Sequence, residues 1–175
     1  VAAAEAFGFD QELPRIPALK PSTIPSDLED SLAVGASAIG QGRVLATPLQ
    51  MASVAATIAN AGRRIEPRLA RIDPTKRTRV VSAKVAGQVR TMMVRVVSGG
   101  TGKAAALPGV QVAGKTGTAE LRAGSNDPAD SDAWFVAFAP ADEPQVAVAV
   151  LVVGGGFGGT VAAPIAKQVL QAALG

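Results

Sequence analysis

The residues best suited to chemistry lie in one short run, residues 112–120, which reads Val-Ala-Gly-Lys-Thr-Gly-Thr-Ala-Glu. Alternate side chains of a strand share a face, so we expect Lys115 and Gly117 on one face and Thr116 and Thr118 on the other. An ammonium group and two hydroxyls suit a carboxylate, and a glycine lets a ligand approach the strand backbone closely. Strand N–H and C=O groups can also pair with an extended peptide. The run therefore predicts a strand that binds an acidic, peptide-like ligand.

A second interpretation of the same letters is a phosphate-binding loop. Gly109, four intervening residues and Gly114-Lys115-Thr116 match the spacing of that motif. The motif requires a glycine-rich loop between its glycines and a helix directly after the threonine. Here the intervening Val-Gln-Val-Ala favours a strand, residues 122–132 are polar and turn-rich, and the apolar run 146–153 ends without an aspartate for magnesium. The context favours a ligand-binding strand over a nucleotide-binding loop.

Composition limits the chemistry that the 175 residues can perform. Apolar residues make up 48% of the chain, enough for a core, but cysteine and histidine do not occur. Any acid–base step must therefore use Lys, Asp or Glu. The net charge of +3 is mild, and the longest apolar run is far too short to span a membrane. Because the chain starts at Val1 with a helix-like segment, we expect it to be part of a longer protein.

The order of the predicted elements indicates an α+β fold. Thr47 can cap a helix that has Pro48 at its first position, and Ser82 begins a second helix. After the strand at 112–120 come two apolar strands, at 134–139 and 145–153, and a closing helix at 161–174. Helices followed by antiparallel strands with a helix on the sheet are typical of α+β proteins. A three-stranded sheet with two apolar faces is incomplete, so we expect further strands from a preceding part.

The first 42 residues are predicted to be less regular. Four prolines, Pro14, Pro17, Pro21 and Pro25, indicate an extended strap. Around it we expect a helix end at 1–7 stopped by Gly8, a short helix at 27–34 capped near Ser26, and a tight glycine-rich loop rather than a helix at 35–42.

Two charged stretches could indicate binding of nucleic acid or of a metal ion, but the sequence favours neither. Residues 63–79 carry seven Arg and Lys residues against Glu66 and Asp73. No aromatic residue lies between Gly62 and Val110 to stack on bases, so we predict a solvated surface and no nucleic-acid partner. Residues 122–132 hold three aspartates, but the glycine and terminal glutamate of a calcium loop are absent. We predict a polar loop there and no metal.

Several motifs, taken in order, resemble the C-terminal half of the transpeptidase domain of class B penicillin-binding proteins. They are Ser37-Ala38-Ile39-Gly40-Gln41-Gly42, Thr47-Pro48-Leu49-Gln50-Met51-Ala52, Asn60-Ala61-Gly62, Ser98-Gly99-Gly100-Thr101-Gly102, residues 114–120, residues 134–140 and Ala163-Pro164-Ile165-Ala166. The resemblance implies the penicillin-binding transpeptidase and serine beta-lactamase fold. It implies that residues 1–175 are the later part of one such domain, with residues 1–106 mainly helical and residues 107–175 forming sheet strands and a closing helix.

The resemblance also implies an activity and roles for four residues. The family catalyses peptidoglycan cross-linking as a serine D,D-transpeptidase and is the target of beta-lactams. Lys115 would supply positive potential toward the nucleophile, Thr116 and Thr118 would hold the substrate carboxylate, and Gly117 would keep the strand open. The backbone N–H of Thr118 would form half of the oxyanion hole. No cofactor is implied.

The nucleophile motif of the family is missing from this sequence. No serine has a lysine three residues later, and no Ser-x-Asn occurs. In the family both motifs precede this stretch, so we expect a chain that cannot be acylated alone and needs the preceding part as its partner. The implied ligands are the D-Ala-D-Ala stem peptide and beta-lactams, on the extracytoplasmic face of the bacterial membrane. The alternative is a non-catalytic beta-lactam sensor or scaffold of the same fold.

Overall fold

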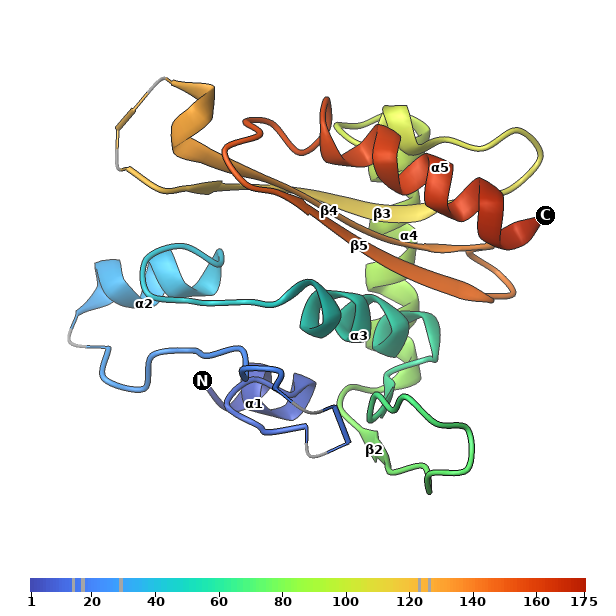
Figure 1. Ribbon diagram of the computed structural model, residues 1–175, viewed down its shortest axis with the longest axis horizontal. Helices are drawn as coiled ribbons and strands as arrows, with labels where there is room; N and C mark the ends of the chain where they lie inside the picture. Colours follow the sequence, from blue (N-terminus) through green and yellow to red (C-terminus); the bar gives the residue numbers. More distant parts are fainter. Residues whose placement is uncertain (14, 17, 29, 123, 126) are drawn as a thin grey trace.

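A three-stranded antiparallel sheet lies between two helical layers in the computed structural model, which describes residues 1–13, 15–16, 18–28, 30–122, 124–125 and 127–175 (Figure 1). The strands are β3 (Ala113–Glu120), β4 (Ser131–Ala139) and β5 (Val146–Val152), in that order across the sheet. Helix α5 (Ala162–Leu174) covers one face, and α3 (Pro48–Ala59) covers part of the other. Helix α4 (Ala83–Ser98) packs against β3. The predicted α+β fold with three antiparallel strands is confirmed.

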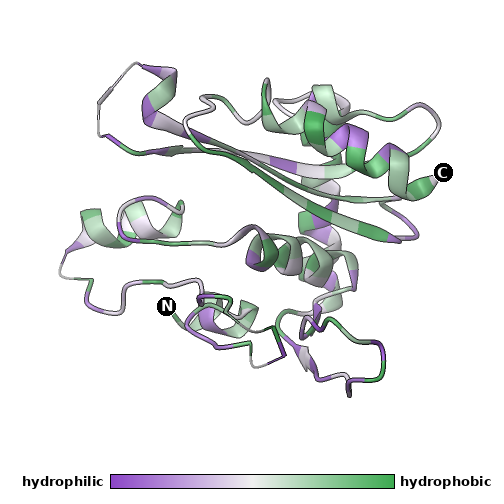
Figure 2. Cartoon of the chain, viewed as in Figure 1, coloured by the Kyte–Doolittle hydropathy of each residue, from purple (hydrophilic) through white to green (hydrophobic). Residues whose placement is uncertain are grey.

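The remaining elements extend from this core. They are α1 (Ala2–Phe7), α2 (Ser31–Ala38), the two-stranded sheet of β1 (Arg63–Ile65) and β2 (Arg77–Arg79), and the short 3-10 helices η1 (Lys103–Ala105) and η2 (Pro128–Asp130). Apolar residues predominate along β5 and α3 (Figure 2). Among the described residues, no helix has the length and apolar character needed to cross a membrane.

The register of the sheet assigns each strand residue to one of two cores. Phe135 lies opposite Thr116 and is fully buried with α5, together with Leu170. Phe138 lies opposite Ala113 and is fully buried with Ile58 of α3 on the other face. A one-residue slip would move each phenylalanine to the wrong core, so the two rings fix the register.

Helices α3 and α4 begin where the sequence predicts. The Thr47 hydroxyl accepts a hydrogen bond from the Gln50 N–H at 3.1 Å, and the Ser82 hydroxyl accepts one from the Val85 N–H at 3.2 Å. Each cap satisfies a backbone donor that the first helical turn leaves free. Helix α1 ends at Gly8, whose φ of 111° suits a glycine.

The prediction for α2 is wrong. This helix spans Ser31–Ala38, not 27–34, so half of the expected 35–42 loop is helical. Asp30 is the cap, because its carboxylate accepts from the Ala33 N–H at 2.7 Å. Asp27 lies before the helix, and its carboxylate forms an ion pair with Arg43 at 2.9 Å. Gly35 has open space around it and is tolerated inside the helix.

The proline-rich segment is extended at residues 20–25, as predicted, but it turns at Ile16, whose N–H donates to the Leu13 carbonyl at 2.9 Å. Thr23 forms an isolated antiparallel bridge with Leu45, and the Ser22 hydroxyl accepts from the Thr47 N–H at 2.9 Å. The strap is thus tied to the lead of α3. Pro14 and Pro17, two of the four prolines in that expectation, lie outside the described residues.

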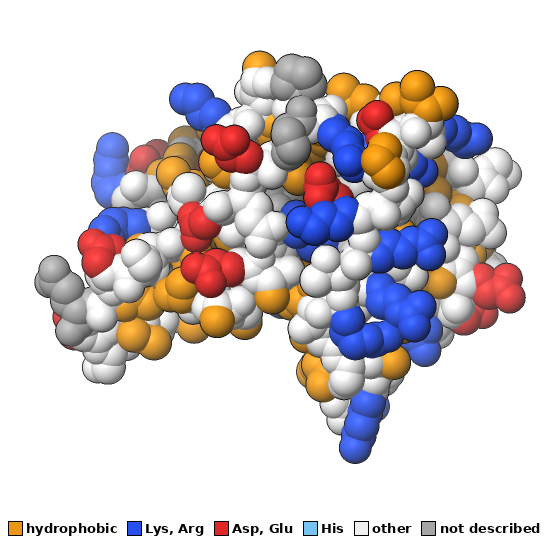
Figure 3. Space-filling model, turned by 90° about the horizontal axis from the view of Figure 1, so that it is seen from below, with side chains coloured by type: hydrophobic (Ala, Val, Ile, Leu, Met, Phe, Trp, Pro, Cys, Tyr) orange, Lys and Arg blue, Asp and Glu red, His pale blue; other side chains and the backbone are white. Residues whose placement is uncertain are grey.

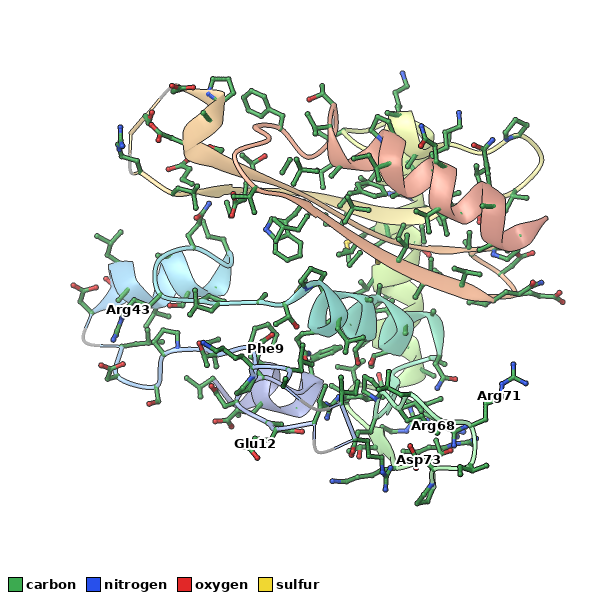
Figure 4. All side chains as sticks on the ribbon, in the orientation of Figure 1. Phe9, Glu12, Arg43, Arg68, Arg71 and Asp73 are labelled. Atoms are coloured by element: carbon green, nitrogen blue, oxygen red, sulfur yellow. The ribbon has the colours of Figure 1, made fainter. Side chains whose placement is uncertain are left out.

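The basic stretch forms the β1–β2 hairpin. Figure 3 shows Lys and Arg side chains gathered on the underside of the molecule, near this hairpin. Arg71 projects from it, whereas the Arg68 guanidinium donates to the Asp73 carbonyl (Figure 4). Arg64 is buried and donates to the Gln11 amide oxygen at 2.8 Å, and burial lowers the pKa of its guanidinium. Part of the charge is therefore structural.

We expect Phe135→Ala to lower the free energy of unfolding by about 3–5 kcal/mol, because it opens a cavity between the sheet and α5. Urea unfolding of this chain, followed by the fluorescence of its single tryptophan, Trp134, measures the change. The control is Phe157→Ala, at a phenylalanine that is 66% exposed, with an expected change within about 0.5 kcal/mol. Equal losses from both variants would contradict the assigned core.

Candidate functional site

The outer edge of β3 is the feature from which the site is built. In the described part of the chain β3 pairs with β4 and no strand lies on its other side. The N–H and C=O of one strand residue point to the same side, and successive residues alternate. The Leu121 N–H donates to the Asp130 carbonyl at 2.8 Å across the hairpin, so odd-numbered residues of β3 point toward β4. Thr116 and Thr118 consequently point their N–H and C=O groups outward.

Two side chains confirm this direction by donating to the outward carbonyls. The Lys115 ammonium donates to the Thr116 carbonyl at 2.7 Å, and the Gln41 amide donates to the Thr118 carbonyl at 3.1 Å. Lys115 is exposed at the edge, and Thr116, Gly117 and Thr118 are half-buried. The strand thus presents a row of backbone donors and acceptors beside a fixed positive charge.

The predicted division of side chains between the two faces is confirmed. Lys115 lies opposite Val136 and Gly117 opposite Trp134, on the face that packs against α3. Thr116 lies opposite Phe135, on the face that packs against α5. Thr118 shares the Thr116 face, since strand side chains alternate.

A hydroxyl to which the sequence motifs assign no role lies beside Thr116. The Thr101 and Thr116 hydroxyl oxygens are 2.8 Å apart, within hydrogen-bonding distance. Thr101 belongs to the turn after α4, and the backbone at Gly159 packs against its carbonyl. Neighbouring Gly158 packs against the carbonyls of Gly117 and Trp134. The glycine-rich turn at 154–159 therefore supports the strand from the α5 side.

A cavity of about 730 Å³ lies on the opposite side of the strand. Its walls come from the β3 run 115–120, from Trp134, Val136 and Leu151 of the sheet, and from the loop at 37–46, with residues of the N-terminal segment closing it. The sheet wall is largely apolar, whereas the β3 edge supplies polar groups. A smaller hollow of about 320 Å³ lies at the other end of the strands, near Gln111 and Pro140, away from the motif.

The loop that carries Gln41 is anchored on both sides of the residue. Gly40 and Gly42 both have positive φ, at 79° and 72°, a backbone conformation that favours glycine. The Gln41 N–H donates to the Ala36 carbonyl at 2.9 Å. Arg43 hydrogen-bonds to the Asp27 carboxylate, which lowers the pKa of Asp27 (Figure 4 labels Arg43). The two glycines signal a special backbone in the sequence, but not the contact with Thr118.

The structure excludes the phosphate-loop interpretation. Strand β3 itself runs through Lys115 and Thr116, and the next helical element that the structure describes is the three-residue η2. The aspartates at 127–132 have structural partners: Asp127 accepts from the Ala129 N–H, Asp130 from the Ser125 hydroxyl and Asp132 from the Gly154 N–H.

This arrangement can bind one end of an extended peptide. The outward N–H and C=O groups can form a short ladder with it, and the Lys115 ammonium with the Thr116 and Thr118 hydroxyls can bind a carboxylate. The apolar wall of the cavity would lie beside such a ladder, and surroundings of low polarity strengthen both interactions.

Known proteins match nearly the whole chain. The family model described as penicillin binding protein transpeptidase domain matches residues 2–171. Peptidoglycan D,D-transpeptidase PbpA of Mycolicibacterium smegmatis is 42% identical over 192 residues, covering 99% of this chain and 38% of that protein. The crystal structure of PBPA from Mycobacterium tuberculosis has a TM-score of 0.85 at 41% identity, covering 99% of this chain and 43% of that one.

A penicillin G acyl-enzyme complex of penicillin-binding protein A from M. tuberculosis has a TM-score of 0.81 at 42% identity, covering 99% of this chain and 42% of that one. The chain therefore spans about two fifths of the length of these relatives.

Gly158→Ala is expected to destabilise the chain by about 1–3 kcal/mol, because a Cβ there would overlap the carbonyl oxygens of Gly117 and Trp134. Urea unfolding measures the loss. The matched control is Gly87→Ala in α4, where nothing lies near the added methyl group, and where we expect a gain of about 0.5–1 kcal/mol. A gain in stability in both variants would contradict the close contact between Gly158 and the carbonyls of Gly117 and Trp134.

Proposed function

This chain belongs to the family of penicillin-binding protein transpeptidase domains, as its motifs predicted, and from that premise we propose that it supplies the substrate-binding strand of a peptidoglycan D,D-transpeptidase. We assign residues 1–175 to one such domain, with a mainly helical part at 1–106 and a sheet part at 107–175. The observation that carries the proposal is the open edge of β3, with outward Thr116 and Thr118 beside the Lys115 ammonium and above a cavity.

We propose that the stem peptide ending in D-Ala-D-Ala extends along this edge. Its terminal carboxylate would lie against the Thr116 and Thr118 hydroxyls and Lys115, since a fixed cation and hydroxyl donors stabilise a carboxylate. The carbonyl oxygen of the penultimate D-Ala would accept from the outward Thr118 N–H. That donor strengthens its hydrogen bond as negative charge develops on the oxygen. Gly117 leaves the backbone open to the peptide.

The nucleophile would come from a Ser-x-x-Lys segment outside this sequence. Its serine oxygen would bond to the penultimate carbonyl carbon, the C–N bond to the terminal D-Ala would break, and D-Ala would leave with a proton. An amine of a neighbouring stem peptide would then take the acyl group and release the serine. In a beta-lactam the C–N bond that breaks is in the ring, so the leaving amine stays attached and the acyl-enzyme persists.

The same reasoning assigns partners and a location. The preceding part of the domain would face the cavity of about 730 Å³ and complete the site. Relatives of which this chain covers about two fifths are peptidoglycan D,D-transpeptidases. Because peptidoglycan is assembled outside the cytoplasmic membrane, we propose an extracytoplasmic location.

The test is an intact-mass spectrum after incubation with benzylpenicillin. We expect no adduct on this chain alone, because it holds no Ser-x-x-Lys, and one adduct on a longer protein in which the chain follows that segment. The longer protein with its motif serine replaced by alanine is the control. Acylation of this chain alone, or no acylation of the longer protein, would overturn the proposal. Acylation without release of D-Ala from a stem peptide would favour the sensor.

The oxyanion role of the Thr118 N–H is tested by Thr118→Pro in the longer protein. Proline removes this backbone donor together with the Thr118 hydroxyl, so Thr118→Val, which removes only the hydroxyl, is measured beside it. An outward N–H on an edge strand is where a sheet tolerates proline. We expect acylation to slow by about 100-fold or more. The control is Glu120→Pro, whose N–H also points outward but lies two residues farther along. Equal slowing in both proline variants would show that strand distortion, rather than the lost donor, is responsible.

A further inference from the structure

The Gln41–Thr118 contact joins two segments that are 77 residues apart in the sequence. Gln41 lines the cavity together with the β3 residues at 115–120. Its amide nitrogen donates to a backbone carbonyl that would otherwise be open to a ligand. The side chain thus occupies a hydrogen-bonding position on the substrate strand itself.

The geometry of an antiparallel pair shows which ligand group competes for that position. A ligand residue paired with Thr118 exchanges two hydrogen bonds with it: its carbonyl accepts from the Thr118 N–H, and its own N–H donates to the Thr118 carbonyl. In the proposed function, that residue is the penultimate D-Ala. In a penicillin, the corresponding donor is the acylamino N–H next to the ring carbonyl. Gln41 therefore stands where this N–H would donate.

We propose that Gln41 is a specificity-determining residue that substitutes for the acyl-donor amide at the Thr118 carbonyl; this inference rests on the proposed function. When the ligand carries the amide N–H, the Gln41 side chain must move away so that this N–H can donate to the Thr118 carbonyl. When the ligand lacks it, Gln41 stays and keeps the carbonyl hydrogen-bonded after the ligand excludes water. A buried acceptor without a donor costs more free energy than an ordinary hydrogen bond contributes. Gln41 therefore lowers the free-energy cost of binding a ligand that lacks the amide.

The loop is anchored so that the fold fixes the position of Gln41. Glycines at 40 and 42 hold the backbone in left-handed conformations on either side of Gln41, and the Gln41 N–H is bonded to the Ala36 carbonyl. The side chain, half-buried against the cavity, can therefore swing away from Thr118 without moving the loop.

The experiment compares acylation by benzylpenicillin and by penicillanic acid, which has the same bicyclic nucleus without the acylamino group. The protein is the longer, acylation-competent form described above. For wild type and each variant, the second-order acylation rate is measured for both compounds and the ratio is taken. We expect Gln41→Leu to raise the ratio of benzylpenicillin to penicillanic acid by about fivefold. Gln41→Glu, which keeps the shape but has no N–H when ionised, should raise it similarly.

The control is Gln111→Leu, at an exposed glutamine outside the cavity around Gln41, where the ratio should not change. An unchanged ratio in both Gln41 variants would overturn the inference, because Gln41 would then act only in holding the loop. A lowered ratio would also overturn it, because Gln41 would then assist the amide. Failure of the proposed function is a separate result: the wild-type longer protein would not be acylated by either compound.

Discussion

One strand edge that has no partner strand among the described residues is the constraint on which the rest of this structure depends. Strand β3 pairs with β4 along its whole length, so only its outer edge is left for a ligand. An open edge invites pairing with other chains, and here it is protected by local means. The Lys115 ammonium lies over the Thr116 carbonyl and Gln41 covers the Thr118 carbonyl. A charge and a movable side chain can both be displaced by a ligand, whereas a fourth strand could not.

The direction of that edge is set by packing on the far side of the strand. The Phe135 ring fills space next to Gly114 and Gly102, where a Cβ would overlap it. The ring thereby ties the turn after α4 to β3, and that turn carries Thr101 to within 2.8 Å of Thr116. If the register slipped by one residue, Lys115 and Gly117 would point their backbone groups outward instead. A buried phenylalanine thus determines which hydrogen-bonding groups the ligand meets.

The sequence predicted the elements whose signals are local. The caps Thr47 and Ser82, and the alternation in β3, depend on residues within one or two turns or strand positions, so the helices and the two faces of the strand were predictable. Helix α2 was misplaced because Ser26, Asp27 and Asp30 are all possible caps by residue type, and the structure uses Asp30. The contacts of Gln41 and Thr101 with β3 join segments 77 and 15 residues apart. No local sequence pattern predicts contacts between residues so far apart in the chain.

In the proposed function, the groups on β3 serve mainly to recognise the acyl donor. The groups on β3 are a fixed cation, hydroxyls and backbone N–H groups, none of which must change protonation to bind a carboxylate and a carbonyl oxygen. In the proposed function, the carbonyl that accepts from the Thr118 N–H remains in the acyl-enzyme. The carboxylate of a stem peptide would leave with D-Ala, whereas that of a beta-lactam would stay attached. The proposed contacts with β3 would therefore all outlast acylation by a beta-lactam, in an enzyme or in a sensor, but only some would outlast acylation by a stem peptide. In the proposed function, the rate at which the acyl group leaves would depend on the Thr118 N–H and also on groups on the other wall of the cavity, where the nucleophile and its base would sit.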